Sequence, residues 1–293
     1  MKAIKISHSG INWFVYIFYE EPILKDYIYE CFKLFKLTSY NDLDLNEKII
    51  NNTQKLIIRK YEEFYKIDNF PENIKSIERL IGLIQEIIFG PYFLESIDYT
   101  FLHGAVVSKN NKATLIIAPT KNGKTTLTSL LLLNNYEYLS DDVIPINNHN
   151  LNVLSFPKVV SIRDLNIIKN YGNQLNQDFN DYFNKMNFEL EVMDSKLNDY
   201  ENKKCYFPKN SAFLLDKEYE IDKIYLLKKN NEITKSRILK VEKNISFINL
   251  LENLRSPLDL GRKKKVIFNI CKEYDIYILE YCDGFDYMRF FNE

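Results

Sequence analysis

One segment constrains the fold of this chain more than any other. Residues 113–133 read ATLIIAPTKNGKTTLTSLLLL. The β-branched run at 114–117 predicts a buried strand, and the Thr/Leu run after residue 124 predicts a helix. A tight polar loop lies between them. We expect an α/β domain in which a strand delivers the chain to an anion-binding loop at the start of a helix.

The loop itself has the composition of a phosphate-binding loop. Ala118, Gly123, Lys124 and Thr125 match the P-loop pattern, with alanine in place of the usual first glycine. Gly123 lets the backbone approach a phosphate closely, and successive N–H groups form an anion-binding nest. Lys124 is predicted to reach the β- and γ-phosphates of ATP, and the Thr125 hydroxyl to ligate Mg²⁺. The predicted nucleotide-binding residues are Pro119, Thr120, Lys121, Asn122, Gly123, Lys124, Thr125 and Thr126. The alternative is a simple lysine-bearing turn, which the flanking strand and helix disfavour.

Two adjacent carboxylates follow the next apolar run. Asp141 and Asp142 follow YEYL at 136–139, with Ser140 between them and that run. In a P-loop fold, an aspartate at the end of a strand lies beside the nucleotide's Mg²⁺. A second carboxylate next to it can accept the proton of an attacking hydroxyl. The alternative is an exposed Asp-Asp turn before Pro145.

His103 lies in a predicted strand at 101–108. A single histidine among apolar residues is typically a core residue. The turn at 109–112 is short, however, so this strand and the P-loop strand should be neighbours. His103 is therefore expected near the reacting groups.

These three features together resemble the HPr kinase/phosphorylase family and its smaller relatives. The resemblance is carried by His103-Gly104, by TLIIAPTKNGKTT and by YLSDDVIPI, over residues 101–146. The segment VVSIRDLNII at 159–168 resembles the family's second signature, and Arg163 matches the arginine of that signature. Ser161, Asp164 and Asn166 replace the glutamate and glycines of that signature, which argues against HPr itself as the acceptor.

The resemblance implies a P-loop domain of the HPr kinase / phosphoenolpyruvate carboxykinase type with a mixed sheet. It implies transfer of the γ-phosphate of Mg-ATP to a serine-type hydroxyl. Asp141 would then be the general base with His103 near it, Asp142 would hold Mg²⁺ or its water, and Arg163 would steady the transferring phosphate. It also resembles small kinases of peptide-modifying pathways such as lasso-peptide maturation.

Outside this core the sequence predicts two regions. Residues 1–95 form a smaller, mainly helical α+β region, a candidate for substrate binding, and residues 96–293 form the kinase domain. Within 1–95 we expect two short strands around Ser9-Gly10, a helix over 22–35 and a long helix over 73–96.

The C-terminal part is predicted to hold helices at 245–257 and 261–274. The basic run 262–265 opens the second of these helices. Such a run is typical of a solvated face, and peptide or phosphate docking is the alternative.

Composition excludes several classes of function. A net charge of −1 offers no global basic field for nucleic acid. The four cysteines and three histidines form no metal-knuckle spacing and no disulfide framework. No apolar run is long enough for a membrane span, and the N-terminus has no cleavage site of a signal peptide. We therefore expect a cytoplasmic protein.

The preferred hypothesis is a kinase that phosphorylates a Ser/Thr hydroxyl of a peptide or small protein. One alternative changes the acceptor to a small metabolite such as free serine or a sugar. A second alternative is a non-catalytic module that binds a peptide under the control of ATP. The sequence does not indicate the acceptor or the oligomeric state.

Overall fold

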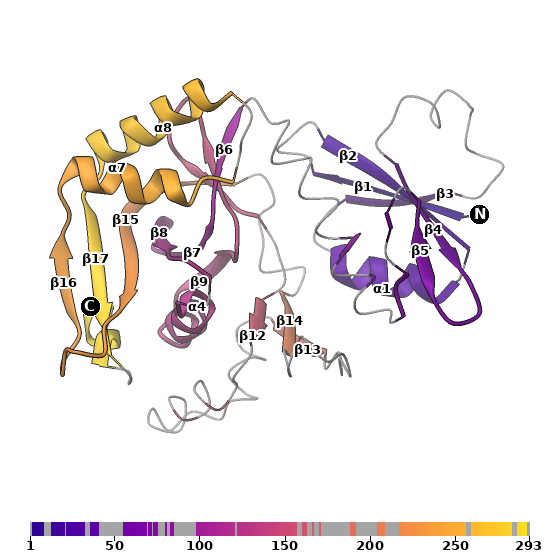
Figure 1. The fold of residues 1–293 in the computed structure, drawn as a ribbon, viewed down its shortest axis with the longest axis horizontal. Coiled ribbons are helices and arrows are strands. Elements are labelled where there is room, and N and C mark those ends of the chain that lie inside the picture. The colour runs from indigo at the N-terminus through magenta and orange to yellow at the C-terminus, as the bar shows by residue number, and fades with distance from the viewer. Residues whose placement is uncertain are drawn as a thin grey trace. The chain divides into compact units, whose positions relative to one another are not determined.

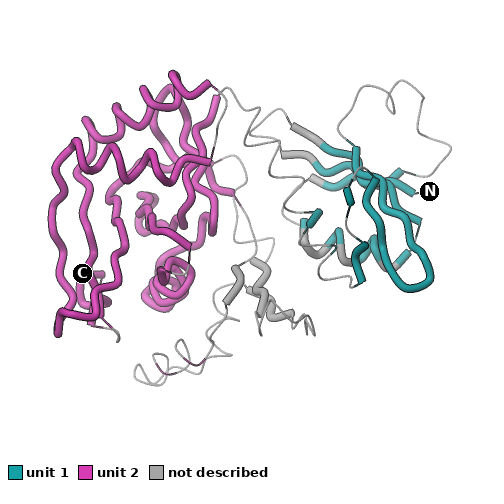
Figure 2. Tube along the Cα trace, viewed as in Figure 1, with its two compact units in different colours: residues 1–92, 193–201 teal, residues 93–192, 202–293 magenta. Residues whose placement is uncertain are grey.

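The fold was analysed in a computed structural model. It describes residues 2–8, 13–20, 22–32, 36–40, 55–68, 70, 71, 73–75, 80, 83, 84, 98–120, 122–156, 160–162, 166, 170, 188–191, 204–208, 217–255, 259–282 and 286–291. The chain divides into two compact units, coloured separately in Figure 2. Unit 1 comprises residues 1–92 and 193–201, and unit 2 comprises 93–192 and 202–293. The boundary predicted at residue 95 stays a prediction, because 91–97 lie outside the described residues.

Unit 1 is built on a sheet of five strands in the order β3-β1-β2-β4-β5. The β2–β4 pair is parallel and the other pairs are antiparallel. The strands are β1 (Lys2–His8), β2 (Trp13–Tyr19), β3 (Lys36–Tyr40), β4 (Lys55–Lys60) and β5 (Tyr65–Ile67). The two strands predicted around Ser9-Gly10 are thus confirmed as β1 and β2.

Helix α1 (Pro22–Phe32) contacts β2 of this sheet. It buries Leu24, Ile28 and Phe32, which recur every four residues and so share one side of the helix. The prediction of a helix from residue 22 is confirmed. The description of this region as mainly helical is wrong for the described residues, where strands predominate.

The long helix predicted over 73–96 falls mostly outside the described residues. Leu80, Leu83 and Ile84 are helical and buried. Ile74 instead forms a β-bridge to Tyr65. The first residues of the predicted helix are therefore extended rather than helical.

Unit 2 contains a mixed sheet of nine strands, which confirms the predicted α/β class with a mixed sheet (Figure 1). The main order is β6-β10-β11-β15-β8-β7-β9, and β17 and β16 continue from β15. These strands are β6 (Tyr99–Leu102), β7 (Gly104–Lys109), β8 (Lys112–Ile117), β9 (Glu137–Ser140), β10 (Ile144–Asn147), β11 (Val153–Leu154), β15 (Glu218–Lys229), β16 (Arg237–Lys240) and β17 (Ile276–Tyr281). A second sheet has the order β12-β14-β13, from β12 (Val160–Ile162), β13 (Phe188–Glu191) and β14 (Lys204–Pro208).

Strand β15 organises the large sheet. It pairs in parallel with β8 on one edge, and along its other edge with β11 and then, in parallel, with β17. The carboxyl ends of β8, β15 and β17 therefore meet at one edge of the sheet. Ligands of α/β proteins bind at this edge.

Helices cover both faces of this sheet, because side chains alternate along each strand. Ala105, Val107 and Ile116 pack with α4 (Lys124–Leu133) and with η3 (Asp286–Phe290). Val106, Leu115 and Ile117 pack with α7 (Lys243–Glu252) and α8 (Leu260–Glu273). The turn between β7 and β8 has Asn110 and Asn111 at φ 54° and 61°, as a tight hairpin turn requires. The sequence predicted this turn correctly.

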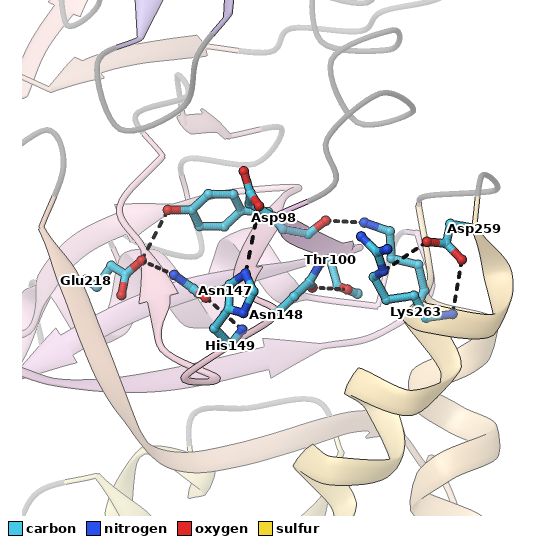
Figure 3. Close-up of polar contacts among 10 residues, drawn as sticks. Asp98, Thr100, Asn147, Asn148, His149, Glu218, Asp259 and Lys263 are labelled. Carbon is cyan, nitrogen blue, oxygen red and sulfur yellow. Dashed lines mark hydrogen bonds and ion pairs between the residues drawn. The ribbon is translucent and has the colours of Figure 1, made fainter.

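Polar contacts hold the outer strand β6 at its N-terminal end (Figure 3). The Glu218 carboxylate accepts hydrogen bonds from the Tyr99 hydroxyl at 3.1 Å and from the Asn147 amide at 2.6 Å. Lys263 of α8 is buried, and its ammonium donates to the Tyr99 carbonyl. Burial lowers the pKa of Lys263. These contacts tie β6 to α8 and β15, and β6 leads directly to His103.

Gly104 lies at the start of β7, where the packing leaves no space for a side chain. A Cβ at this position would lie 2.5 Å from Ile144 Cδ1 and 2.7 Å from the Ile116 carbonyl oxygen, and the backbone oxygen cannot move aside. We expect Gly104→Ala to lower the free energy of unfolding of unit 2 by about 1–3 kcal/mol, measured by urea denaturation.

Gly261 provides the matched control. It lies in α8 with no atom within 4 Å of an added Cβ. Gly261→Ala should stabilise the unit by about 0.5–1 kcal/mol, because alanine favours a helix. Equal effects of the two substitutions would contradict the packing around Gly104.

Candidate functional site

The predicted loop connects β8 to α4 at the carboxyl edge of the parallel strands. Gly123 precedes α4 with φ 72°, a left-handed conformation that glycine adopts without strain. A side chain there would also lie 2.8 Å from the Tyr281 hydroxyl. Ala118 is not among the described residues with positive φ, so alanine is accommodated at the start of the loop. Gly123, the residue that precedes α4, has no side chain to cap the helix, and the first-turn N–H groups of a helix are a favourable place for an anion.

Lys124 is turned inward against its own loop. The residue is 6% exposed, and its ammonium donates to the carbonyls of Ala118 at 2.8 Å and Pro119 at 3.0 Å. Burial lowers its pKa, and the charges of Asp142 and Asp141 oppose that shift. A phosphate that binds here must exchange these carbonyl contacts for its own oxygens.

Asp141 joins β9 to the first turn of α4. It is 2% exposed, and its Oδ2 accepts a hydrogen bond from the Thr125 hydroxyl at 3.0 Å. Its Oδ1 accepts from the backbone N–H of Asp142 at 3.0 Å. A buried carboxylate requires such donors. The threonine predicted to ligate Mg²⁺ is therefore in direct contact with the aspartate predicted as the general base.

Asp142 has a different environment. It is half-buried and has φ 66°, an uncommon conformation for a residue other than glycine. Its charge is the largest of the acidic influences on Lys124 and also acts on His103. Asp142 thus lies close enough to Lys124 and His103 for its charge to act on both.

His103 follows β6 and is 8% exposed. Its Nδ1 lies 3.1 Å from the carbonyl oxygen of Asp142 and 2.8 Å from Nη2 of Arg255. Because a guanidinium can only donate, the contact with Arg255 requires a proton-free Nδ1, whereas the contact with Asp142 requires a protonated one. Only one of these hydrogen bonds forms at a time. The second ring nitrogen, Nε2, is buried without a hydrogen-bond partner among the described residues.

Arg255 is the residue that the sequence did not single out. The helix predicted over 245–257 ends as α7 at Glu252, and the chain then pairs with β6. The backbone N–H of Arg255 donates to the Phe101 carbonyl at 2.9 Å, and the backbone N–H of His103 donates to the Asn253 carbonyl at 2.7 Å. This pairing carries the arginine to the histidine from a distant part of the sequence. An arginine within a predicted helix carried no signal of this contact.

The remaining predicted residues divide into two groups. Asn122 and Thr126 are half-buried, and Pro119 and Thr120 are exposed along the loop. Lys121 and Arg163 lie outside the described residues. Their predicted roles stay predictions.

The donor set fits Mg²⁺ bound together with a nucleotide. Thr125 and the two aspartates supply oxygen ligands, which this ion prefers. The described part of the chain holds no group of three or more His, Cys, Asp or Glu residues suited to a metal ion. Mg²⁺ is commonly held by one or two carboxylates plus substrate phosphates, which matches this limited set. Among the described helices, none is long and apolar enough to cross a membrane.

Comparisons with known proteins do not assign the chain to a family. No protein-family model matches the sequence, and no curated protein matches it. Among solved structures, the Hpr(Ser) kinase/phosphatase from Coxiella burnetii is similar with 12% sequence identity, over 62% of this chain and 85% of that chain, at a TM-score of 0.28. A TM-score this low supports no argument, and the function must be inferred from the site.

The electrostatics of His103 can be tested directly. Burial, followed by the charges of Lys124 and Arg255, lowers the pKa of His103 to about 4. Its ordinary value is about 6.5, so the imidazole is neutral near pH 7. We expect its NMR titration midpoint near 4, and a higher midpoint in Arg255→Gln, which removes one cation. A midpoint that Arg255→Gln leaves unchanged would contradict the contact.

The same shift determines how His103 contributes to stability. As the pH falls below about 6.5, the unfolded chain binds a proton that the folded protein does not. The contribution is therefore complete above that pH and is lost as the pH falls toward 4. Between about pH 6.5 and 4, the urea concentration at the midpoint of unfolding should fall less steeply with decreasing pH in His103→Gln than in the wild-type protein.

Proposed function

We propose that this chain is a Mg²⁺-ATP-dependent phosphotransferase that acts on a hydroxyl group. The observation that carries the proposal is the hydrogen bond of the Thr125 hydroxyl to the buried Asp141 carboxylate at 3.0 Å. Thr125 is the residue that follows Lys124 in the sequence. A plain lysine-bearing turn does not require a buried carboxylate bonded to the hydroxyl after its lysine. P-loop enzymes use such a hydroxyl and an aspartate together to hold the ion.

In this proposal the backbone of 118–125 and the Lys124 ammonium bind the phosphates of ATP. Thr125 and Asp141 would hold Mg²⁺, which neutralises phosphate charge when bound. Asp142 accepts the proton of the acceptor hydroxyl. The hydroxyl oxygen forms a bond to the γ-phosphorus, the bond from that phosphorus to the β–γ bridging oxygen breaks, and ADP leaves.

This assignment exchanges the two aspartate roles that the family resemblance implies. The two oxygens of Asp141 accept hydrogen bonds from Thr125 and from the Asp142 N–H, and the side chain is almost fully buried. Asp142 is more accessible and acts on both Lys124 and His103. A base must reach the substrate, which favours Asp142.

The acceptor is proposed to be a Ser or Thr hydroxyl of a peptide or small protein, in line with the sequence resemblance. Arg255 is proposed to steady the transferring phosphate, since its guanidinium lies at His103 and its charge acts on Lys124. The neutral imidazole adds no third positive charge there. It holds Arg255 or the Asp142 carbonyl by hydrogen bonding.

The aspartate roles are tested by paired amide substitutions. We expect Asp142→Asn to slow transfer by about 10²–10⁴-fold and leave Mg-ATP affinity nearly unchanged. Asp141→Asn should instead raise the Mg²⁺ concentration required for ATP binding. Calorimetry measures binding, and intact-mass spectrometry measures phosphate added to a panel of serine and threonine peptides.

Lys124→Ala is the control for nucleotide chemistry and should remove measurable transfer. The reverse pattern for the two aspartates would restore the roles implied by the resemblance. ATP binding without transfer to any peptide would require the same assay with free serine and sugars. Failure of both acceptor classes would contradict the kinase and favour an ATP-controlled binding module.

Arg255 gives an independent test within the same assay. Arg255→Gln keeps a donor but removes the charge, and we expect transfer to slow by about 10²-fold with ATP affinity within a few fold of wild type. Arg262→Gln is the matched control, because Arg262 pairs with Asp259 at 3.0 Å on the surface of α8. Equal losses in the two variants would contradict the role of Arg255.

A further inference from the structure

Exposed apolar side chains of unit 2 gather in one part of the chain. Of the six large hydrophobic side chains that are exposed among the described residues, five lie between residues 239 and 268. Ile245 and Ile248 on α7 are 44% and 55% exposed, and Phe268 on α8 is 60% exposed. Single exposed apolar residues are common, but a cluster of this kind is typical of an interaction surface.

These side chains lie on the outer side of two adjacent helices. α7 and α8 are in contact and pack on the same face of the large sheet through buried residues such as Leu250 and Ile267 (Figure 1). Ile245, Ile248 and Glu252 share one side of α7 by their spacing of three and four residues. Lys265, Phe268 and Lys272 share one side of α8 in the same way. We refer to these six residues as the outer helical face.

The charges of this face are unevenly distributed. Lys265 and Lys272 are exposed on either side of Phe268. Within the described ranges no ion pair involves either lysine, whereas the neighbouring Arg262 is held by Asp259. The whole chain has a net charge of −1, so this pair of lysines is a local feature and not a general excess of positive charge. Its complement is a partner with acidic side chains.

We propose that the outer helical face binds an amphipathic helical peptide segment with apolar anchors and acidic residues along one flank. Ile245, Ile248 and Phe268 contact its apolar stripe, and Lys265 and Lys272 contact its carboxylates. Helical segments bind in this way to apolar faces, with anchors at every third or fourth residue. The binding is independent of the phosphate site, so it goes beyond the proposed catalysis.

A peptide fits this face better than an anionic membrane does. Glu252 lies in the same stripe as the two isoleucines, so the face is not uniformly basic as binding to a sheet of acidic lipid headgroups requires, whereas a peptide can keep its acidic residues on the flank beside Lys265 and Lys272. Peripheral membrane helices combine a wide apolar stripe with a strongly basic face. The outer helical face has only one apolar residue on its basic helix.

The test uses a labelled helical peptide of about 16 residues, with leucine at every third or fourth position and glutamate on one flank. Its binding to the full chain is measured by fluorescence anisotropy. A scrambled peptide of the same composition and vesicles of phosphatidylcholine with phosphatidylserine serve as the other two probes. We expect specific binding of the helical peptide, weakened by raising the salt from about 50 to about 300 mM.

Substitutions locate the binding to this face. Lys265→Glu with Lys272→Glu should weaken it by about 10-fold or more, and Ile248→Ala with Phe268→Ala by a similar factor. The matched controls are Lys112→Glu and Tyr61→Ala, which change an exposed lysine and an exposed apolar residue outside the face. Both controls should bind as wild type does.

Three results would overturn the proposal. They are equal binding of the scrambled peptide, preferential binding of the vesicles, and self-association of the protein that the Ile248→Ala/Phe268→Ala variant removes. Lys124→Ala should bind the peptide as wild type does. A protein that binds the peptide but transfers no phosphate would therefore count against the proposed enzyme activity and not against this surface.

Discussion

The candidate site depends on the hydrogen bond between the Thr125 hydroxyl and the buried carboxylate of Asp141. It joins the first turn of α4 to the end of β9, two elements that pack around β7. The burial of Asp141 makes this contact necessary, because a carboxylate removed from water requires donors. Lys124 precedes Thr125, and Asp142 follows Asp141. The same bond therefore brings the predicted phosphate-binding lysine and the second carboxylate close to each other.

Burial and the charges around this bond together explain why His103 is neutral. Burial acts on its imidazole first, and the charges of Lys124 and Arg255 add to the effect. A charged imidazole would be a third cation beside Lys124 and Arg255. The neutral ring can still bond to Arg255 or to the Asp142 carbonyl, and it thereby connects the cationic and acidic sides of the site.

The helices α7 and α8 link this site to the rest of unit 2. Their inner residues form part of the sheet's core, and Lys263 of α8 holds the outer strand β6. The segment between the two helices pairs with β6 and brings Arg255 to His103. Their outer sides carry the exposed apolar residues and lysines. One pair of helices thus supports the sheet, supplies a site residue and presents a surface.

The sequence by itself determined the elements with strong local signals. The strand, glycine and helix around Lys124 required no distant contact, because periodicity and the left-handed glycine are local properties. Hairpins and α1 were predictable for the same reason. The five-stranded sheet of unit 1, the early end of α7 and the contact of Arg255 with His103 were decided by tertiary structure. Each depends on which strand edge a segment meets, and pairing between residues so far apart leaves no trace in local sequence.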